Sequence, residues 1–262
     1  MFNWSRDRYY YHKIDPVYST QKPWVAEGER WDWVAIYDYQ RDPAGNIVHG
    51  SDGFPLVNKF TTLKGYSEPD WIWGLSTSVN WKGITLSINI DGRVGGVGYS
   101  MTDQAMWNSG AHIDSDNQYR YEEVVNNNKT FTGQGVKVVS GKAEWDANGN
   151  VIMDNRVFAP NDKVVSYQDY MMNTNPYASG DNKRAQNWFD KTFIKLRDLS
   201  ISYEIPQSVC QKIGMKGASV GFVGQNLLMW AKEFRFSDPD KVQDALSSPS
   251  IRYMGFNVKF DF

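Results

Sequence analysis

The sequence lacks most of the residues that build disulfides, metal centres and catalytic sites. Among its 262 residues it has one cysteine, Cys210, and its three histidines, His12, His49 and His112, stand far apart. Neither residue type has the spacing of a metal site, and one cysteine cannot form an internal disulfide. No HExxH motif, no Ser-His-Asp order and no evident pair of catalytic carboxylates is present. These absences predict a protein that is not an enzyme and needs no cofactor and no metal.

The sequence also lacks an excess of charge and long apolar runs. Lys and Arg number 28 against 30 Asp and Glu, for a net charge of −2. We therefore expect no nucleic-acid partner, because polyanion binding depends on a basic surface. An ordinary transmembrane helix is excluded because no run of about 18 apolar residues occurs, although alternating barrel strands escape that test. The N-terminal stretch MFNWSRDRYYYHK has no apolar core of a signal peptide.

Aromatic residues, by contrast, are abundant. They make up 15% of the chain, with 11 Trp and 15 Tyr, while the mean hydropathy stays at −0.56. This combination suits a soluble sugar-binding β-protein, whose rings stack on sugars, or a membrane β-barrel, whose rings form belts at the two lipid interfaces.

The strongest local pattern is a predicted hairpin. From Trp71 to Trp81 every second position is apolar except Thr77, with Trp near both ends, and the alternate positions after Ile72 are small or polar. Lys82-Gly83 reverses the chain, and Ile84 to Asp91 alternates in the same way. A strand of about 9 to 11 residues can cross a bilayer when tilted. The Trp residues then lie where interfacial belts belong.

Three further strands are predicted near the C-terminus. Alternation runs from Met254 to Phe262 at the last residue, and from Leu199 to Ile205. Lys195 and Arg197 break the second pattern, which we interpret as a strand leaving the apolar zone or as a β-bulge. A weaker alternation covers Ala218 to Trp230.

The connections between these strands fall into two classes. Strands that alternate in direction place the short turns, Lys82-Gly83 and Pro206 to Gly217, at one end of the sheet. The long connections, Gln40 to Asp70, the stretch after Asp91 up to about Thr192, and Ala231 to Pro249, then lie at the other end. This is the habit of outer-membrane barrels. The middle stretch could hold an extra hairpin that uses Val164 to Met171.

Three segments resemble the C-terminal part of the SusC/RagA class of TonB-dependent outer-membrane transporters of Bacteroidetes. They are GYSEPDWIWGLSTSVNWKGITLSINIDGRVGG (Gly65–Gly96), FIKLRDLSISYEIPQSVCQKIGMKGASVGFVGQNLLMW (Phe193–Trp230) and PSIRYMGFNVKFDF at the end. They cover under half of the chain, but their order and spacing agree with that class. The remaining segments match only in general style.

The resemblance implies an all-β fold of antiparallel transmembrane strands, part of a plugged barrel of about 22 strands, with long extracellular loops. It implies import of oligosaccharides, or of peptides in some members, energised by the TonB complex. It also implies a SusD-like surface lipoprotein as lid, insertion by the barrel assembly machinery and a location in outer-membrane lipid. Residues 1–262 would be the C-terminal part of that receptor barrel. Because they show no plug, TonB-contacting segment or signal peptide, we expect a fragment, a truncated reading frame or one part of a split barrel.

Candidate functional residues follow from the same resemblance. The alternating residues Phe256, Val258, Phe260 and Phe262 look like the signal by which the assembly machinery recognises a final strand. Possible contacts with substrate or lid are Trp107, Tyr119, Tyr121, Trp145, Tyr167, Tyr170, Trp188 and Arg197. For the loop rings the alternative is packing of loops on each other, and for Arg197 it is a structural ion pair in the barrel wall.

Two other functions are compatible with the sequence. A soluble glycan-binding β-sandwich would account for the Trp and Tyr content, but it would have to cover the apolar faces of Leu75, Ile88 and Phe260 in a core. A small autonomous barrel with a role in adhesion or structure would fit the length of the chain.

Overall fold

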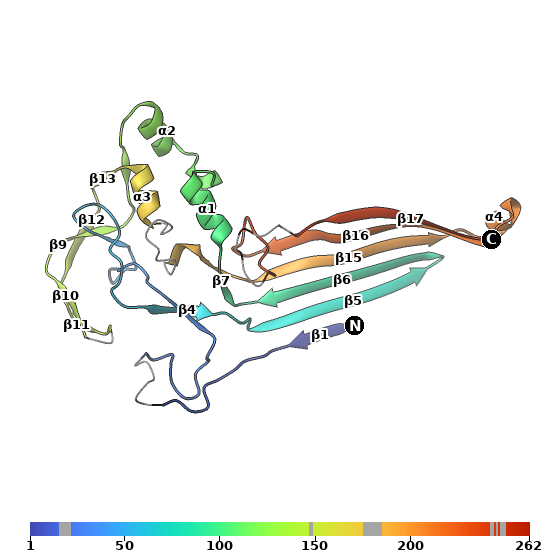
Figure 1. Cartoon of the computed structure of the whole chain (residues 1–262), viewed down its shortest axis with the longest axis horizontal. Coiled ribbons are helices and arrows are strands. Elements are labelled where there is room, and N and C mark those ends of the chain that lie inside the picture. The colour runs from blue at the N-terminus through green and yellow to red at the C-terminus, as the bar shows by residue number, and fades with distance from the viewer. Residues whose placement is uncertain (16–21, 147–148, 175–184, 242–243, 245, 247–249) are drawn as a thin grey trace. The chain divides into compact units, whose positions relative to one another are not determined.

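The computed structural model describes the chain except for residues 16–21, 147–148, 175–184, 242–243, 245 and 247–249 (Figure 1). The chain divides into two compact units. Unit 1 contains Met1–Arg8, Glu68–Gly98 and Asp190–Phe262, and unit 2 contains Tyr9–Ser67 and Tyr99–Phe189. The chain passes between them four times, after Arg8, after Ser67, within β7 (Val97–Tyr99) and within β14 (Trp188–Asp190).

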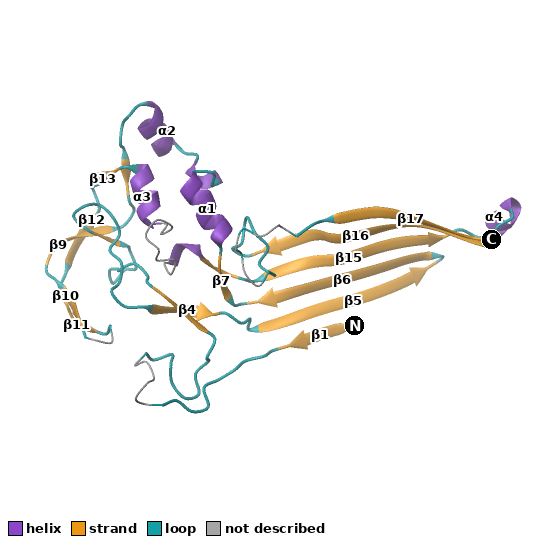
Figure 2. Cartoon of the chain, viewed as in Figure 1, coloured by secondary structure: helices purple, strands orange, loops and turns teal. Residues whose placement is uncertain are grey.

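A six-stranded antiparallel sheet forms unit 1 (Figure 2). In spatial order its strands are β1 (Phe2–Ser5), β5 (Trp71–Trp81), β6 (Ile84–Val94), β15 (Phe193–Glu204), β16 (Gly217–Ala231) and β17 (Tyr253–Asp261). The strands predicted from alternation are confirmed. β1 was not predicted, because four residues are too few for a periodic signal; its Phe2 lies opposite Leu75 of β5 and its Trp4 opposite Trp73.

Cross-strand pairing gives this sheet one apolar face. Leu75 pairs with Ile90, Ile88 of the same face pairs with Leu199, and Phe222 pairs with Phe256. Because side chains alternate along a strand, residues paired in this register share a face. Trp73 extends this face over Gly92, where an added Cβ would lie 2.6 Å from the indole ring. The opposite face carries Ser, Thr, Asn and Asp side chains, so the sheet is two-sided.

The apolar face is uncovered in unit 1. Exposed fractions reach 64% for Phe2, 64% for Trp81 and 82% for Phe256. A soluble sandwich packs such a face in a core about 10 Å thick against a second sheet. No second sheet covers it among the described residues of unit 1. The sandwich alternative therefore lacks the packing that it requires.

Both short turns have the expected chemistry. Lys82 (φ 48°) and Gly83 (φ 83°) both adopt left-handed backbone conformations, the requirement of a two-residue type I′ hairpin. Between β15 and β16, Pro206 precedes the short helix α4 (Gln207–Cys210) and the 3₁₀ turn Gln211–Ile213, and Gly214 ends it with a φ of 76°. A short helical segment thus connects these two strands.

The long connections leave the sheet at the end opposite to these turns, as predicted. β6 ends at Val94 and β15 begins at Phe193, while β16 ends at Ala231 and β17 begins at Tyr253. The first of these connections contributes residues Tyr99–Phe189 to unit 2.

A β-bulge at Arg197 interrupts β15. Leu196 pairs with Ile90 of β6, whereas Asp198 pairs with Asn89, so Arg197 is an extra residue in the ladder. Leu196 and Leu199 are three positions apart, so in a regular strand they would point to opposite faces; because of the bulge both join the apolar face. Lys195 is thereby left on the polar face. The bulge interpretation of the sequence break is confirmed.

Short elements make up unit 2. Its helices are α1 (Met101–Ser109), α2 (Gln118–Val125) and α3 (Tyr167–Thr174), with 3₁₀ turns at Ile113–Ser115 and Ala185–Asn187. Its sheets pair β2 (Trp33–Ile36) with β4 (Thr62–Tyr66), β10 (Ala143–Trp145) with β11 (Val151–Asp154), β13 (Val164–Val165) with β8 (Phe131–Thr132), and β9 (Val136–Ser140) with both β12 (Val157–Pro160) and β3 (Val48–His49). The fold is thus mostly β, with short helices that the sequence analysis did not anticipate.

The middle stretch does hold an extra antiparallel pair, β10 with β11, but the hairpin suggested for Val164 to Met171 is wrong. Only Val164 and Val165 form a strand, and the helix α3 begins at Tyr167. The Ser166 hydroxyl accepts a hydrogen bond from the Asp169 amide, as an N-cap does. In addition, the Glu123 carboxylate of α2 accepts hydrogen bonds from the Ser166 hydroxyl and the Tyr167 amide. These bonds favour a helix over the return strand of a hairpin.

Buried side chains in unit 2 come from distant parts of the sequence. They include Ile36, Tyr39, Val48, His49, Val165, Tyr167 and Tyr170. Within the described ranges, no helix is both long and apolar enough to span a membrane.

Candidate functional site

The loop aromatics predicted as contacts are spread over five elements of unit 2. Trp107 lies in α1, Tyr119 and Tyr121 in α2, Trp145 in β10, Tyr167 and Tyr170 in α3, and Trp188 in β14. Arg197 belongs to β15 of unit 1. The structure therefore divides the predicted set between a ring cluster, two pockets and an ion network.

Local capping positions the helices that carry these rings. The Ser100 hydroxyl accepts from the Asp103 amide at the start of α1, and Gly110 ends that helix with a φ of 70°. The Asn117 side chain accepts from the Arg120 amide at the start of α2. Such caps satisfy amides that have no partner inside the helix. Each helix therefore begins at a defined residue, and this start determines the side of the helix on which each aromatic ring lies.

Tyr119, Tyr167 and Tyr170 meet around Phe131. The centroid of Phe131 lies 5.2 Å from that of Tyr119, 5.3 Å from that of Tyr167 and 4.9 Å from that of Tyr170. Tyr167 and Tyr170 are buried, and burial raises the pKa of the Tyr170 hydroxyl to about 12. These two rings hold β8 and α3 together, in agreement with the packing interpretation.

A small pocket of about 200 Å³ adjoins this cluster. Its lining includes Trp107, Arg120, Tyr167, Met171 and Met172. Arg120 Nη1 donates to the Gly110 carbonyl at 2.7 Å and to the Ser115 hydroxyl at 2.8 Å, which fixes the guanidinium at the pocket. Because ligand sites for drug-sized molecules measure about 300 to 1,000 Å³, this pocket has room for one side chain or one sugar ring.

A second pocket, of about 550 Å³, contains Trp145. It also presents Trp24, Tyr39 and Phe60, together with charged residues of both signs. Arg156 connects its two sides, because Nη1 donates to Gln40 at 2.8 Å and Nη2 to Asp154 at 2.6 Å. The volume falls within the range of ligand sites. Trp24 and Phe60 were missed by the sequence analysis, because neither stands in a repeating pattern.

Trp188 and Tyr121 belong to neither pocket lining. The Trp188 ring lies 5.4 Å from that of Tyr99, so it packs on a neighbouring strand residue. Tyr121 is exposed on α2. Of the seven predicted loop rings, Trp107, Tyr167 and Trp145 are therefore the ones that line pockets.

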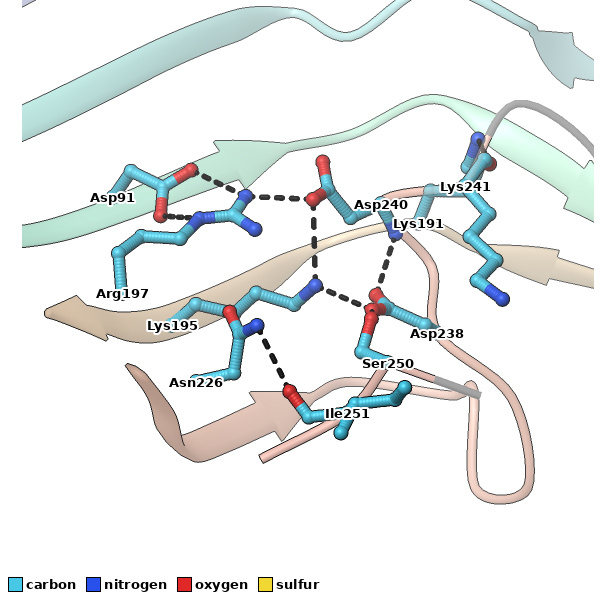
Figure 3. Close-up of polar contacts among 10 residues, drawn as sticks. All are labelled: Asp91, Lys191, Lys195, Arg197, Asn226, Asp238, Asp240, Lys241, Ser250 and Ile251. Atoms are coloured by element: carbon cyan, nitrogen blue, oxygen red, sulfur yellow. Dashed lines mark hydrogen bonds and ion pairs between the residues drawn. The ribbon is translucent and has the colours of Figure 1, made fainter. Parts of the chain in front are cut away.

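Arg197 lies in an ion network of unit 1 (Figure 3). Its Nε and Nη2 donate to the two carboxylate oxygens of Asp91 at 2.5 and 2.8 Å, and Nη2 also reaches Asp240 at 2.6 Å. Lys195 Nζ lies 2.5 Å from Asp238. Burial raises the pKa of Asp238, but hydrogen bonds from Lys195 and Ser250 outweigh it and keep the pKa below the usual range. These contacts agree with the structural interpretation of Arg197.

No three His, Cys, Asp or Glu side chains converge as a metal site in the described ranges. His112 instead stacks on Trp107, with 4.2 Å between ring centroids, and its Nε2 lies 3.2 Å from Asp103. This histidine therefore has a packing role beside the small pocket.

The two-sided sheet, with short turns at one end and long connections at the other, has the architecture of a β-barrel wall. Solved structures of the RagAB peptide importer share this fold. In its "closed-closed" state the likeness has a TM-score of 0.55 at 15% identity and covers 100% of this chain and 27% of that chain. For the "open-open" state the TM-score is 0.52 at 18% identity, and the likeness covers 100% of this chain and 26% of that chain. The chain thus spans about a quarter of the length of the solved chains that it matches.

At the level of fold, the resemblance to the SusC/RagA class that the sequence suggested is confirmed. No protein-family profile and no curated protein matches the sequence.

Proposed function

We propose that this chain is the C-terminal part of the barrel of a SusC/RagA-like TonB-dependent transporter in the bacterial outer membrane. The observation that carries this proposal is the continuous, uncovered apolar face of the six-stranded sheet. Lipid is the solvent that stabilises such a face, whereas in water a patch of this extent favours aggregation. The likeness to a peptide importer supports a transport role over a catalytic one.

The distribution of rings on this face supports placement in a bilayer. Trp71 and Trp230 lie toward the end with long connections, and Trp81, Tyr203 and Phe260 lie toward the end with short turns. Interfacial belts of barrels have this arrangement. We infer that the long connections are extracellular and the short turns periplasmic. The assembly machinery would then recognise Phe256, Val258, Phe260 and Phe262 in the final strand.

We infer an oligosaccharide or a peptide as the transported substrate, with a SusD-like lipoprotein as partner and energy from the TonB complex. The pocket that holds Trp145 supports this assignment, because its rings and its charges of both signs could contact either kind of polymer. The small pocket at Trp107 would take one residue or one sugar ring of such a substrate.

The experiment that tests the location is an immunoblot of fractionated source cells with an antibody against residues 101–174. The proposal predicts a band in the outer-membrane fraction that resists extraction by carbonate and has a mass well above the 30.0 kDa of this chain. A band near 30 kDa in the soluble fraction would contradict it and favour a glycan-binding module.

The substrate is tested by growth of the source bacterium on single glycans or on peptides, with Trp145→Ala compared with Trp188→Ala. Trp145 lines the larger pocket and Trp188 packs on Tyr99. We expect Trp145→Ala to slow growth on one of the two nutrient classes and Trp188→Ala to have less effect. Equal growth of wild type and Trp145→Ala on every nutrient would exclude the pocket from uptake.

A further inference from the structure

Two described parts of the segment between β16 and β17, Phe234–Lys241 and Ser250–Arg252, contact the sheet of unit 1 through polar and charged side chains. These two parts are called the strap here. Two strap carboxylates, Asp238 and Asp240, meet Lys195 and Arg197 of β15, and Arg197 also contacts Asp91 of β6 (Figure 3). These five side chains are called the ionic latch.

The contacts of the ionic latch form an unbroken chain from the sheet to the strap. Arg197 Nε lies 2.5 Å from Asp91, and its Nη2 lies 2.6 Å from Asp240. Asp240 also lies 3.3 Å from Lys195 Nζ, which lies 2.5 Å from Asp238. Asp240 is therefore shared by both cations. Removal of one member leaves at least one other charge without a full set of partners.

Burial makes the Lys195–Asp238 pair the centre of the latch. The side chains are only 2% and 3% exposed, so water cannot replace either partner. A buried ammonium without a carboxylate is strongly unfavourable. Lys195 is fixed in the sheet because β15 pairs on both sides, with Asp91 of β6 and Met229 of β16 opposite it. The strap must therefore stay where its carboxylates reach Lys195.

Proline and three further hydrogen bonds stiffen the strap around this pair. Pro239 is fully buried between the two acids, and its ring restricts the backbone that presents them. The Ser250 hydroxyl donates to Asp238. Beyond the acids, Lys191 Nζ donates to the Lys241 carbonyl at 3.1 Å, and Asn226 Nδ2 donates to the Ile251 carbonyl at 3.2 Å. Both parts of the strap are thus hydrogen-bonded around the Lys195–Asp238 pair.

The ion pair at the base of the strap differs from the latch. Lys232 lies 2.6 Å from Asp190, but the lysine side chain is 52% exposed. Exposed pairs contribute little because water and salt compete for both partners. The electrostatic hold on the strap therefore resides at Lys195 rather than at Lys232.

We propose that the ionic latch closes the strap onto β6 and β15 and that loss of the Lys195 charge releases the whole strap as one unit. The strap is then a conformational element with a closed state and an open state. This inference concerns unit 1 alone; its test rests on the proposed barrel, whose assembly is measured separately by heat-dependent gel mobility, so failure of the barrel proposal is distinguishable from failure of the latch.

The test is limited trypsin digestion of the protein as its cells produce it, in isolated membranes, comparing wild type with Lys195→Met. Cleavage is read after Arg235 and after Lys241, which lie on the two sides of the latch acids. We expect both cleavage rates to rise together by at least about tenfold in Lys195→Met, because release of a buried pair opens a cooperative segment. A double variant, Lys195→Met with Asp238→Asn, should be no more sensitive than Lys195→Met.

The matched control is Lys259→Met in β17, where the lysine side chain is 74% exposed and lies 3.6 Å from Asp261. It should leave both cleavage rates unchanged. Each variant is first checked for an assembled barrel by heat-dependent gel mobility. If Lys195→Met does not assemble, Asp240→Asn replaces it, since Asp240 is 38% exposed, and a smaller parallel rise is expected. An assembled variant that is cleaved like wild type, or at only one of the two sites, overturns the proposal.

Discussion

His49 is a buried histidine whose two ring nitrogens have different partners. Nδ1 lies 3.3 Å from the Val136 carbonyl, so it carries the proton, and Nε2 lies 3.0 Å from the Tyr170 hydroxyl, from which it can accept. Burial lowers the pKa of His49 below the usual value of 6.5, although the Val136 carbonyl opposes this. The folded unit 2 therefore holds this ring in the neutral state at neutral pH.

This assignment predicts a pH dependence for unit 2. The unfolded chain binds a proton at His49 near pH 6.5, whereas the folded chain binds it only at lower pH. The free energy of unfolding should thus fall as pH decreases through 6.5 and level off below the folded pKa. Hydrogen exchange of amides in β9 and α3, corrected for the pH dependence of intrinsic exchange rates, measures this free energy between about pH 7.5 and about pH 5.5.

Two variants compare the contribution of His49 with that of an exposed histidine. His49→Gln should remove most of the pH dependence, while His12→Gln, at an exposed position, should retain it. Equal pH dependence in His49→Gln and wild type would show that another group is responsible.

Among the elements, the hairpin between β5 and β6 depends on its two-residue turn. Gly83 has a φ of 83°, and an added Cβ would lie 3.3 Å from the Glu204 carbonyl oxygen. Gly83→Ala should therefore destabilise the assembled sheet by about 1 kcal/mol. The measurement is urea unfolding, in which the folded fraction is read from heat-dependent gel mobility, and the variant should unfold at a lower urea concentration. Gly255→Ala is the control, because no atom lies within 4 Å of its added Cβ and its φ is not in the left-handed region. An equal loss in both variants would rule out the turn as the cause.

The final strand β17 gives a second prediction at this scale. If Phe262 is part of an assembly signal, Phe262→Ser should lower the yield of assembled protein in the outer membrane and raise the amount degraded. Phe2→Ser removes an exposed ring from β1 at the opposite edge of the sheet and should lower the yield less. Pulse-chase labelling of membrane fractions measures both yields. Similar losses would mean that apolar area, and not position at the terminus, decides assembly.

At the scale of the whole molecule, the two faces of the sheet should respond differently to charge. Leu75 lies on the apolar face and Ser76 on the polar face near the middle of β5. Arginine on a lipid-facing strand position costs about 2–4 kcal/mol at the bilayer midplane. Leu75→Arg should reduce the carbonate-resistant membrane fraction, and Ser76→Arg should leave it near the wild-type level. Equal tolerance of both substitutions would show that this face does not contact lipid.

The sequence predicts unit 1 better than unit 2 because the two folds use different kinds of information. Alternation around Trp71 and the Lys82-Gly83 pair is local, and it was sufficient for strands, turns and faces. The Lys195–Asp238 pair is separated by 43 residues, and no local pattern indicates which acid reaches the lysine. In unit 2, Glu123 anchors the start of α3 across a separation of 43 and 44 residues at Ser166 and Tyr167. The pocket around Trp145 likewise depends on Trp24 and Phe60, which only tertiary structure brings together.

The bulge in β15 has a consequence for insertions and deletions in this sheet. β15 uses 12 residues where its neighbour β6 uses 11. Removal of a residue from the interior of the strand outside the bulge at Arg197 and Asp198 would shift the phase of every side chain on one side of the deletion, exchanging its apolar and polar faces. Removal of Arg197 would instead leave Ile194, Leu196, Leu199 and Ile201 in phase. Arg197, which forms two ion pairs, thus stands at a position whose deletion the alternation of the strand could absorb, and its contacts rather than the phase of the strand account for its presence.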